Sequence, residues 1–177
     1  MNFKPADIII TREKSNLLSN SIIAVLRFFQ SDPVEYQHSM LVANQDTCIE
    51  ANLKIEMSIL ADRFEDLKKY KVLRHNNLTD EQREAIVNRA KTLLGKRYSF
   101  GRLFLQLLDQ IFSTDYFTRR VKDPDQQICS SLIAWCYGRE TGIKFNNLNW
   151  SAVEPDDIDD ESLKNNTPFE TILEWEI

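Results

Sequence analysis

The chain has 177 residues, of which 27 are acidic and 22 are basic, so its formal net charge is −5. Its hydrophobic share of 42% and charged share of 28% are those of a folded globular domain and exclude a disordered segment. An acidic chain is poorly suited to neutralise phosphate groups, and we therefore expect no nucleic-acid partner. The length, without a linker rich in Gly, Pro or Ser, predicts a single domain over 1–177.

The composition also argues against cofactors and metals. The four glycines are too dispersed for a dinucleotide fingerprint or a phosphate-binding loop, since both need several glycines within about ten residues. Three cysteines and two histidines form neither a disulfide framework nor a pattern of metal-ligand spacing. We therefore expect no cofactor, no metal and a reducing compartment.

The start of the chain does not resemble a secretory signal. The most apolar window covers 21–29 and contains Arg27, whereas a membrane-spanning helix needs about 20 apolar residues. We therefore expect no transmembrane segment and a cytoplasmic location. The sequence indicates no particular oligomeric state.

Strands dominate the first part of the chain. A short buried strand is predicted over 7–11, followed by an amphipathic helix over 17–29. The segments 36–43 and 47–52 flank a turn and predict a β-hairpin, and another strand is predicted over 70–74.

Helices dominate the second part of the chain. The clearest covers 80–94, with Thr79 as N-cap, Gln82 completing a capping box and Gly95 as the C′ residue. Three further elements are predicted: a helix over 100–112 with an apolar stripe, a helix over 129–141 that ends at Gly142, and a strand over 172–175. Together these elements predict an α+β fold.

Cys129 is the cysteine best placed to act as a nucleophile. It stands where a loop enters the helix 129–141, and the unpaired backbone N–H groups at a helix start lower the pKa of a thiol. Cys136, within the same helix, and Cys48, within a strand, are expected to be small buried hydrophobes.

The two histidines differ in their settings. His75 lies in a polar stretch and is expected to be a solvated loop residue. His38 interrupts a strand, at a half-buried position where an imidazole needs a hydrogen-bonding partner. From the residue pattern alone, His38 is either a structural residue or a general base, and the structural role is the commoner one.

Two sets of short motifs resemble the NlpC-type papain-like cysteine hydrolases. The histidine set consists of Pro5-Ala6-Asp7-Ile8-Ile9, Gln37-His38-Ser39-Met40-Leu41-Val42 and Ile49-Glu50-Ala51. The cysteine set consists of Gly95-Lys96-Arg97-Tyr98, Ile128-Cys129-Ser130-Ser131-Leu132 and Gly142, and the later Pro155-Asp156-Asp157-Ile158 is similar to a Pro-x-Asp-Leu element. The histidine set comes first, as in the circularly permuted branch, the YiiX/YaeF-like group, to which lecithin:retinol acyltransferase-like enzymes are related.

This resemblance implies a circularly permuted papain-like fold, in which a small antiparallel sheet carries His38 and packs against the helix of Cys129. It implies a cysteine hydrolase that cleaves an amide bond in a peptide or peptidoglycan fragment through a Cys129 acyl-enzyme, with His38 as general base. Tyr98, Ser130 and Asn52 are expected to contact the substrate. The alternatives are a thiol acyltransferase or esterase acting on lipid, which makes the partner a small peptide or acyl substrate, and a binding module without turnover.

Glu50 is predicted to orient His38, because the resemblance puts the third polar residue on the strand after the histidine. With the hairpin turn centred on Gln45, Met40 lies opposite Glu50 and His38 opposite Asn52, which sets Glu50 diagonally from His38 on one face of the sheet. Asn52 is the alternative orienting residue. A carboxylate partner raises the pKa of a histidine, so Glu50→Gln is expected to lower the acid limb of the pH profile.

The segment between Tyr98 and Cys129 is longer than a minimal connection needs. Its apolar stripe predicts either a helix packed on the core, which is the commoner case, or a lid over the site.

Overall fold

The computed structural model describes residues 2–14, 35–52, 54–97 and 129–177. The helices predicted over 17–29 and 100–112, and the lid between Tyr98 and Cys129, lie outside the described residues.

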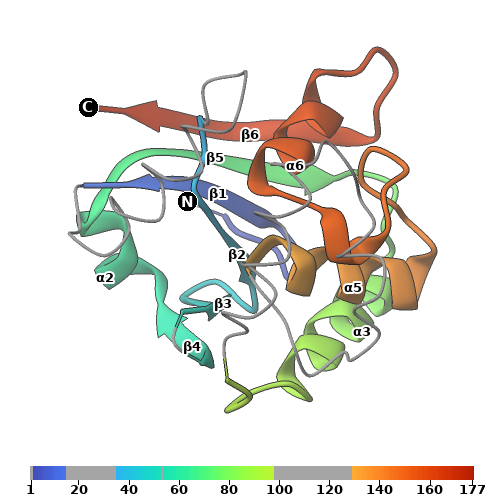
Figure 1. The fold of residues 1–177 in the computed structure, drawn as a ribbon, viewed down its shortest axis with the longest axis horizontal. Coiled ribbons are helices and arrows are strands. Elements are labelled where there is room, and N and C mark those ends of the chain that lie inside the picture. The colour runs from blue at the N-terminus through green and yellow to red at the C-terminus, as the bar shows by residue number, and fades with distance from the viewer. Residues whose placement is uncertain (1, 15–34, 53, 98–128) are drawn as a thin grey trace, which may run out of the picture.

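The described residues form one antiparallel sheet of six strands, with helices packed against it (Figure 1). The strand order is β4-β3-β2-β1-β5-β6. The strands are β1 (Ile8–Glu13), β2 (His38–Val42), β3 (Thr47–Ala51), β4 (Ile55–Ile59), β5 (Leu67–His75) and β6 (Phe169–Glu176). The helices are α2 (Leu60–Glu65), α3 (Asp80–Lys91), α5 (Cys129–Thr141), the 3-10 helix η2 (Trp150–Ala152) and α6 (Pro155–Leu163).

The predicted α+β class is confirmed. Among the predicted elements that the structure describes, α5 has the predicted bounds and the others have revised ends. The strand expected over 70–74 grows into the nine residues of β5, because β5 lies between β1 and β6 and pairs with both. Four of the described elements were not predicted: β4, α2, η2 and α6. None of the described helices combines the length and the apolar content that a membrane crossing requires.

The two faces of the sheet carry separate apolar clusters. Ile8 and Ile10 point to the face covered by α3, α5 and α6, whereas Ile9 between them points to the other face. On that second face Ile9 packs with Met40 and with Leu60 of α2. Because side chains alternate along each strand, the sequence parity of a residue decides which of the two clusters it joins.

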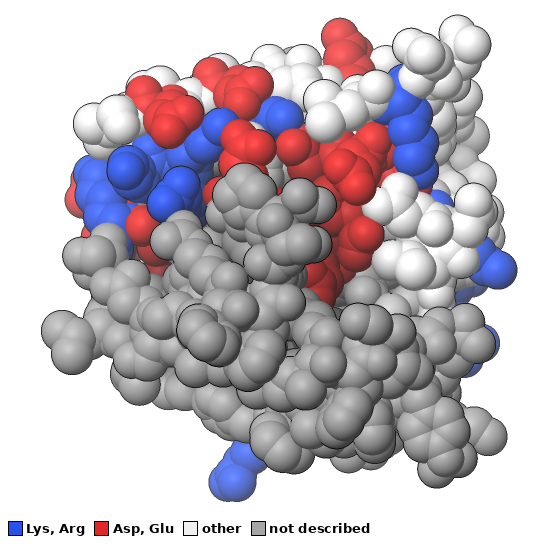
Figure 2. Space-filling model, turned by 45° about the horizontal axis from the view of Figure 1, so that its top comes forward, with Lys and Arg blue, Asp and Glu red and all other residues white. Residues whose placement is uncertain are grey.

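Ion pairs join β5 to β6 and α6 at one end of the sheet. The Lys71 ammonium donates to Asp159 Oδ1 of α6 at 2.7 Å, and both side chains are buried. Lys69 pairs with Glu35 and lies 3.4 Å from Glu176 Oε2 and 3.7 Å from Glu174 Oε1. Figure 2 shows acidic and basic side chains next to one another over the upper part of one face of the molecule. Both lysines lie on β5, and the carboxylates beside them offset the cost of burying their ammonium groups.

His75 is not the solvated loop residue that its polar neighbours predict. It is the last residue of β5, is only 6% exposed, and packs edge-on against Phe169 at 4.8 Å between ring centroids. Arg83 of α3 donates to the His75 carbonyl at 2.6 Å, which fixes the end of the strand. Burial, followed by the nearby Arg83 charge, lowers the pKa of the His75 imidazole. Its buried setting therefore favours a neutral structural histidine.

Helix α3 begins as predicted and ends earlier than predicted. Thr79 Oγ1 accepts from the Gln82 backbone N–H at 3.2 Å, and Gln82 Oε1 accepts from the Thr79 N–H at 3.0 Å, which completes the capping box. The C-cap is Thr92, so Gly95 is not the C′ residue. Gly95, with φ of +82°, instead ends the turns that follow the helix and donates its N–H to Ile55 of β4.

We expect Thr79→Ala to lower the free energy of unfolding by about 1 kcal/mol, because it leaves an N-terminal N–H of α3 without its acceptor. Urea unfolding followed by circular dichroism measures this loss. The control is Thr92→Ala at the other end of α3, where the hydroxyl donates only to the Arg89 carbonyl of its own helix. A loss in the control as large as that in Thr79→Ala would contradict the role of the capping box.

Candidate active site

Cys129 is the first residue of α5 and lies buried beside strand β2. The backbone N–H groups of Ser39 and Ser130 act on its thiol and help to lower the thiol pKa. Ser39 belongs to β2 and follows His38 directly, so the thiol meets the strand at the histidine. Helix α5 and β2 thereby bring together two residues that are far apart in the sequence.

The β2–β3 hairpin has the register that the sequence predicts. Met40 lies opposite Glu50, Leu41 opposite Ile49 and Val42 opposite Cys48. The ladder described by these pairs ends at Met40 and Glu50, and at this end of β2 His38 pairs with Thr11 of β1. Glu50 therefore lies diagonally from His38 on the same face of the sheet.

The His38 imidazole and the Glu50 carboxylate are in direct contact. His38 Nε2 lies 2.9 Å from Glu50 Oε2, with His38 12% exposed and Glu50 wholly buried. Burial by itself raises the pKa of Glu50, but the hydrogen bond and charge of His38, together with Ser58 and Arg63, lower it to about 2. An ionised carboxylate only accepts, so Nε2 carries the hydrogen and donates it. This leaves Nδ1 as the ring nitrogen for Cys129.

The pKa values of His38 and Cys129 move in opposite directions. Burial lowers the pKa of His38, but the hydrogen bond and charge of Cys129, and then those of Glu50, outweigh it and raise this pKa to about 10. Burial raises the pKa of the Cys129 thiol, but the hydrogen bond and charge of His38 and the two backbone N–H groups bring it below its ordinary value. Both shifts favour a pair of thiolate and imidazolium over a neutral pair, and the thiolate is the reactive form of a cysteine nucleophile.

A second cation faces the other oxygen of Glu50. Arg63 Nε lies 3.1 Å from Glu50 Oε1, which is within ion-pair distance but outside hydrogen-bond geometry. Arg63 Nη2 donates to Glu13 Oε1 of β1 at 2.8 Å. Sequence reasoning missed Arg63 because it missed β4 and α2. The strict alternation of Ile55, Met57 and Ile59 with polar residues was the available signal for β4.

The other predicted site residues lie in different settings. Ser130 is fully buried and its hydroxyl donates to the Val153 carbonyl at 2.6 Å, so its side chain serves the fold. The Asn52 amide donates to Glu56 Oε1 at 3.3 Å, and the partner of His38 is Glu50 rather than Asn52. Tyr98 lies outside the described residues.

The Pro155-Asp156-Asp157-Ile158 motif holds the segment that leads into β2, the strand of His38. Asp156 Oδ1 accepts from the Tyr36 backbone N–H at 2.9 Å, two residues before His38. Asp157 Oδ2 accepts from the Glu154 N–H at 2.8 Å and so completes the capping box of α6. Burial raises the pKa of Asp156 to about 6. The motif therefore ties the start of α6 to the segment that enters β2.

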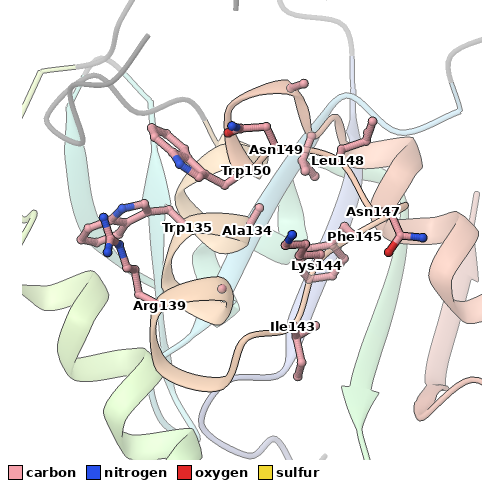
Figure 3. A pocket seen from close by; sticks show the side chains of 13 residues that line it. Ala134, Trp135, Arg139, Ile143, Lys144, Phe145, Asn147, Leu148, Asn149 and Trp150 are labelled. Atoms are coloured by element: carbon pink, nitrogen blue, oxygen red, sulfur yellow. The ribbon is translucent and has the colours of Figure 1, made fainter. Parts of the chain in front are cut away.

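A cavity of about 550 Å³ lies beside α5, and Figure 3 shows the side chains that line it. Ala134, Trp135 and Gly138 of α5 line it, and the helical period puts them on the face opposite Cys129. Trp150 and Val153 close it from the η2 side. Its lining includes none of Cys129, His38 and Glu50, so it is separate from their contact.

In the described parts of the chain, no group of three or more His, Cys, Asp or Glu side chains is arranged to hold a metal ion.

The chain belongs to the permuted papain-like amidases of the YaeF/YiiX or C92 family, whose sequence model matches residues 3–168. A similar solved structure is that of the metalloprotein yiiX from Escherichia coli O157:H7, at 20% sequence identity and a TM-score of 0.59. The alignment covers 97% of this chain and 88% of that one. At this identity the likeness shows the fold, and the expected permuted papain-like fold is confirmed. No curated protein matches the chain. Family membership supports a hydrolase of the amidase type.

We expect iodoacetamide at pH 7 to alkylate Cys129 more than about a hundredfold faster than the other two cysteines, because alkylation needs a thiolate. Burial raises the pKa of Cys48 to about 12 and also raises the pKa of Cys136. Mass spectrometry of the tryptic peptides measures the three rates. In urea the three cysteines should react alike, and equal rates in the folded protein would contradict an activated Cys129.

Proposed function

We propose that the protein is a cysteine amidase in which Cys129 is the nucleophile, His38 transfers protons and Glu50 orients His38. The observation that carries this proposal is the continuous contact from the Cys129 thiol through the imidazole to a buried carboxylate. A cysteine at a helix start, a histidine on a neighbouring strand and a fixed third group supply the parts that acyl transfer requires.

In the first half of the reaction the Cys129 thiolate attacks the carbonyl carbon of an amide, and the carbonyl electron pair moves onto oxygen. The His38 imidazolium then gives its Nδ1 proton to the leaving nitrogen, so that an amine departs and a thioester remains. The backbone N–H of Cys129 has no partner within its own helix and is available to the developing oxyanion.

In the second half His38 is neutral and acts as the base. It takes a proton from water, the hydroxide equivalent attacks the thioester, and the carbon–sulfur bond breaks. The products are a carboxylic acid and the Cys129 thiolate beside an imidazolium, which restores the starting state. The Glu50 carboxylate holds the ring in one orientation through both halves.

We propose a peptide or a peptidoglycan fragment as the substrate, because family membership supports amide chemistry. The test is incubation with a panel of short peptides and soluble peptidoglycan fragments, with detection of the new amino groups. The same assay with acyl esters decides between this proposal and a lipid esterase: hydrolysis of esters alone would overturn the amidase assignment. If neither the amides nor the esters are hydrolysed although Cys129 is rapidly alkylated, the amidase assignment is overturned and the thiol acts in another reaction.

We expect Cys129→Ser and His38→Ala each to reduce turnover to background while the protein stays folded, because each removes a group used in the chemical step. The double variant should be no less active than either single variant, since the two groups act as a unit. Cys136→Ser is the matched control, because it changes a buried thiol of the same helix outside the contact and should affect stability only, by about 1 kcal/mol. Retained turnover in Cys129→Ser would end the proposed mechanism.

Glu50→Gln is expected to reduce turnover and to move both limbs of the pH profile to lower pH. The carboxylate favours the imidazolium, so its loss lowers the pKa of His38 from about 10 and shifts the alkaline limb downward. The acid limb marks the pH at which the doubly protonated pair of Cys129 and His38 loses its first proton. It also moves to lower pH, because the negative charge of Glu50 no longer holds that proton. The pH dependence of kcat/KM measures both limbs, and an unchanged profile would contradict the role of Glu50.

A further inference from the structure

We propose that Arg63 is a positioning residue of this site, which keeps the Glu50 carboxylate ionised and fixed against His38 during the steps in which His38 is neutral. The inference rests on the roles proposed above for Cys129, His38 and Glu50. It concerns a residue outside every motif on which those roles were based.

Arg63 supplies a positive charge beside the most deeply buried negative one. A thiolate at Cys129, an imidazolium at His38 and the Glu50 carboxylate together carry one net negative charge, and the Arg63 guanidinium lies between that buried carboxylate and the partly exposed Glu13. Once the thioester has formed, the thiolate and the imidazolium have lost their charges. Glu50 is then a wholly buried carboxylate with a neutral imidazole on one oxygen, and the described cation at its other oxygen is Arg63, at 3.1 Å.

An isolated buried carboxylate takes up a proton rather than remain charged. A protonated Glu50 would no longer accept from His38 Nε2, and the ring would lose both its orientation and the charge that makes it a stronger base. A fixed cation at the far oxygen prevents this. The arrangement therefore requires Arg63 most when His38 acts on water.

Arg63 is held in place from several sides. Its Nη2 donates to Glu13 Oε1 at 2.8 Å, so one guanidinium meets two carboxylates through two different nitrogens. A lysine ammonium lacks this fork geometry. The short helix α2 is tied at its start, where the Leu60 N–H donates to the Asp46 carbonyl, and at its end, where the Lys14 N–H donates to the Asp66 carbonyl, both at 2.9 Å. Arg63 thus extends from an anchored backbone.

Several groups act on Glu50 besides Arg63. His38 of β2 lies on one oxygen, with Cys129 of α5 beyond it, and Ser58 of β4 donates a hydrogen bond. Cys48 of its own strand is held neutral by its raised pKa. Glu56 lies opposite Glu50 on β4, but it forms an ion pair with Lys54, with 3.5 Å between Lys54 Nζ and Glu56 Oε2. Arg63 and its partner Glu13 can therefore each be neutralised without touching the proposed catalytic contact.

The experiment measures the rate of Cys129 alkylation by iodoacetamide as a function of pH in Arg63→Gln. Removing the positive charge should raise the acid limb by about one pH unit, which lowers the rate on that limb about tenfold. Glu13→Gln, which removes a negative charge and leaves Arg63 in place, should shift the limb slightly in the opposite direction. Arg63→Lys, which keeps the charge without the fork, should restore part of the shift.

Arg74→Gln is the matched control. Arg74 Nη2 lies 2.6 Å from Oδ2 of the wholly buried Asp7, much as Arg63 lies beside the wholly buried Glu50. The two arginine side chains are similarly exposed, Arg74 to 17% and Arg63 to 19%. It removes an ion pair of the same kind elsewhere on the sheet, so it should reduce stability and leave the acid limb unmoved. A shift in this control equal to that in Arg63→Gln would reduce Arg63 to a structural residue.

The double variant Glu50→Gln/Arg63→Gln separates action through Glu50 from direct action on the thiol. If Arg63 acts through Glu50, its removal should change the limb much less in the Glu50→Gln background than in the wild-type protein. An equal shift of the acid limb in both backgrounds would overturn the proposal. If only one of Arg63→Gln and Glu13→Gln folds, an unshifted acid limb in that variant would overturn it as well. If wild-type Cys129 itself shows no rapid alkylation, the proposed function fails first, and the two failures are thereby distinguished.

Discussion

Glu50 is a carboxylate without contact with solvent, and several of the described elements supply the fixed partners that a buried charge needs. A buried charge is stable only when fixed partners of opposite charge or fixed donors surround it. Strand β2 supplies His38, β4 supplies Ser58 and α2 supplies Arg63, with β1 holding Arg63 through Glu13. Three elements thus act on one side chain, and a fourth holds Arg63. Their convergence also sets the orientation of the imidazole that faces Cys129.

The order of the motifs along the chain does not affect this geometry. The site consists of a helix start placed against a strand, and either element can come first if the connection allows the same packing. Here the histidine strand precedes the cysteine helix, as in the permuted amidases to which the chain belongs. A third element also helps to place His38. Asp156 of α6, near the end of the chain, accepts a hydrogen bond from the backbone of Tyr36, in the segment just before His38.

Local signals explain most of what could be predicted. The register of the β2–β3 hairpin follows from a turn of known parity, because each residue's partner is fixed once the turn is placed. The capping box of α3 depends on residues three apart. Gly95 was assigned to the C′ position by the same local rule and the assignment was wrong, because α3 ends at Lys91 and the chain makes further turns before β4 accepts the Gly95 N–H. A tertiary contact there overrode the local preference.

The sequence by itself determined the α+β class and the pairing that sets Glu50 diagonally from His38, and it indicated Cys129 as the candidate nucleophile among three cysteines. Each of these depends on neighbours in the chain or on a short motif. Only the tertiary structure decided that the Ser130 hydroxyl turns to Val153, that His75 is buried against Phe169, and that Arg63 lies beside Glu50. These contacts join segments far apart in the chain; Arg63 and Glu13, for example, are separated by 50 positions. Their geometry depends on how whole elements pack, and no local periodicity records it.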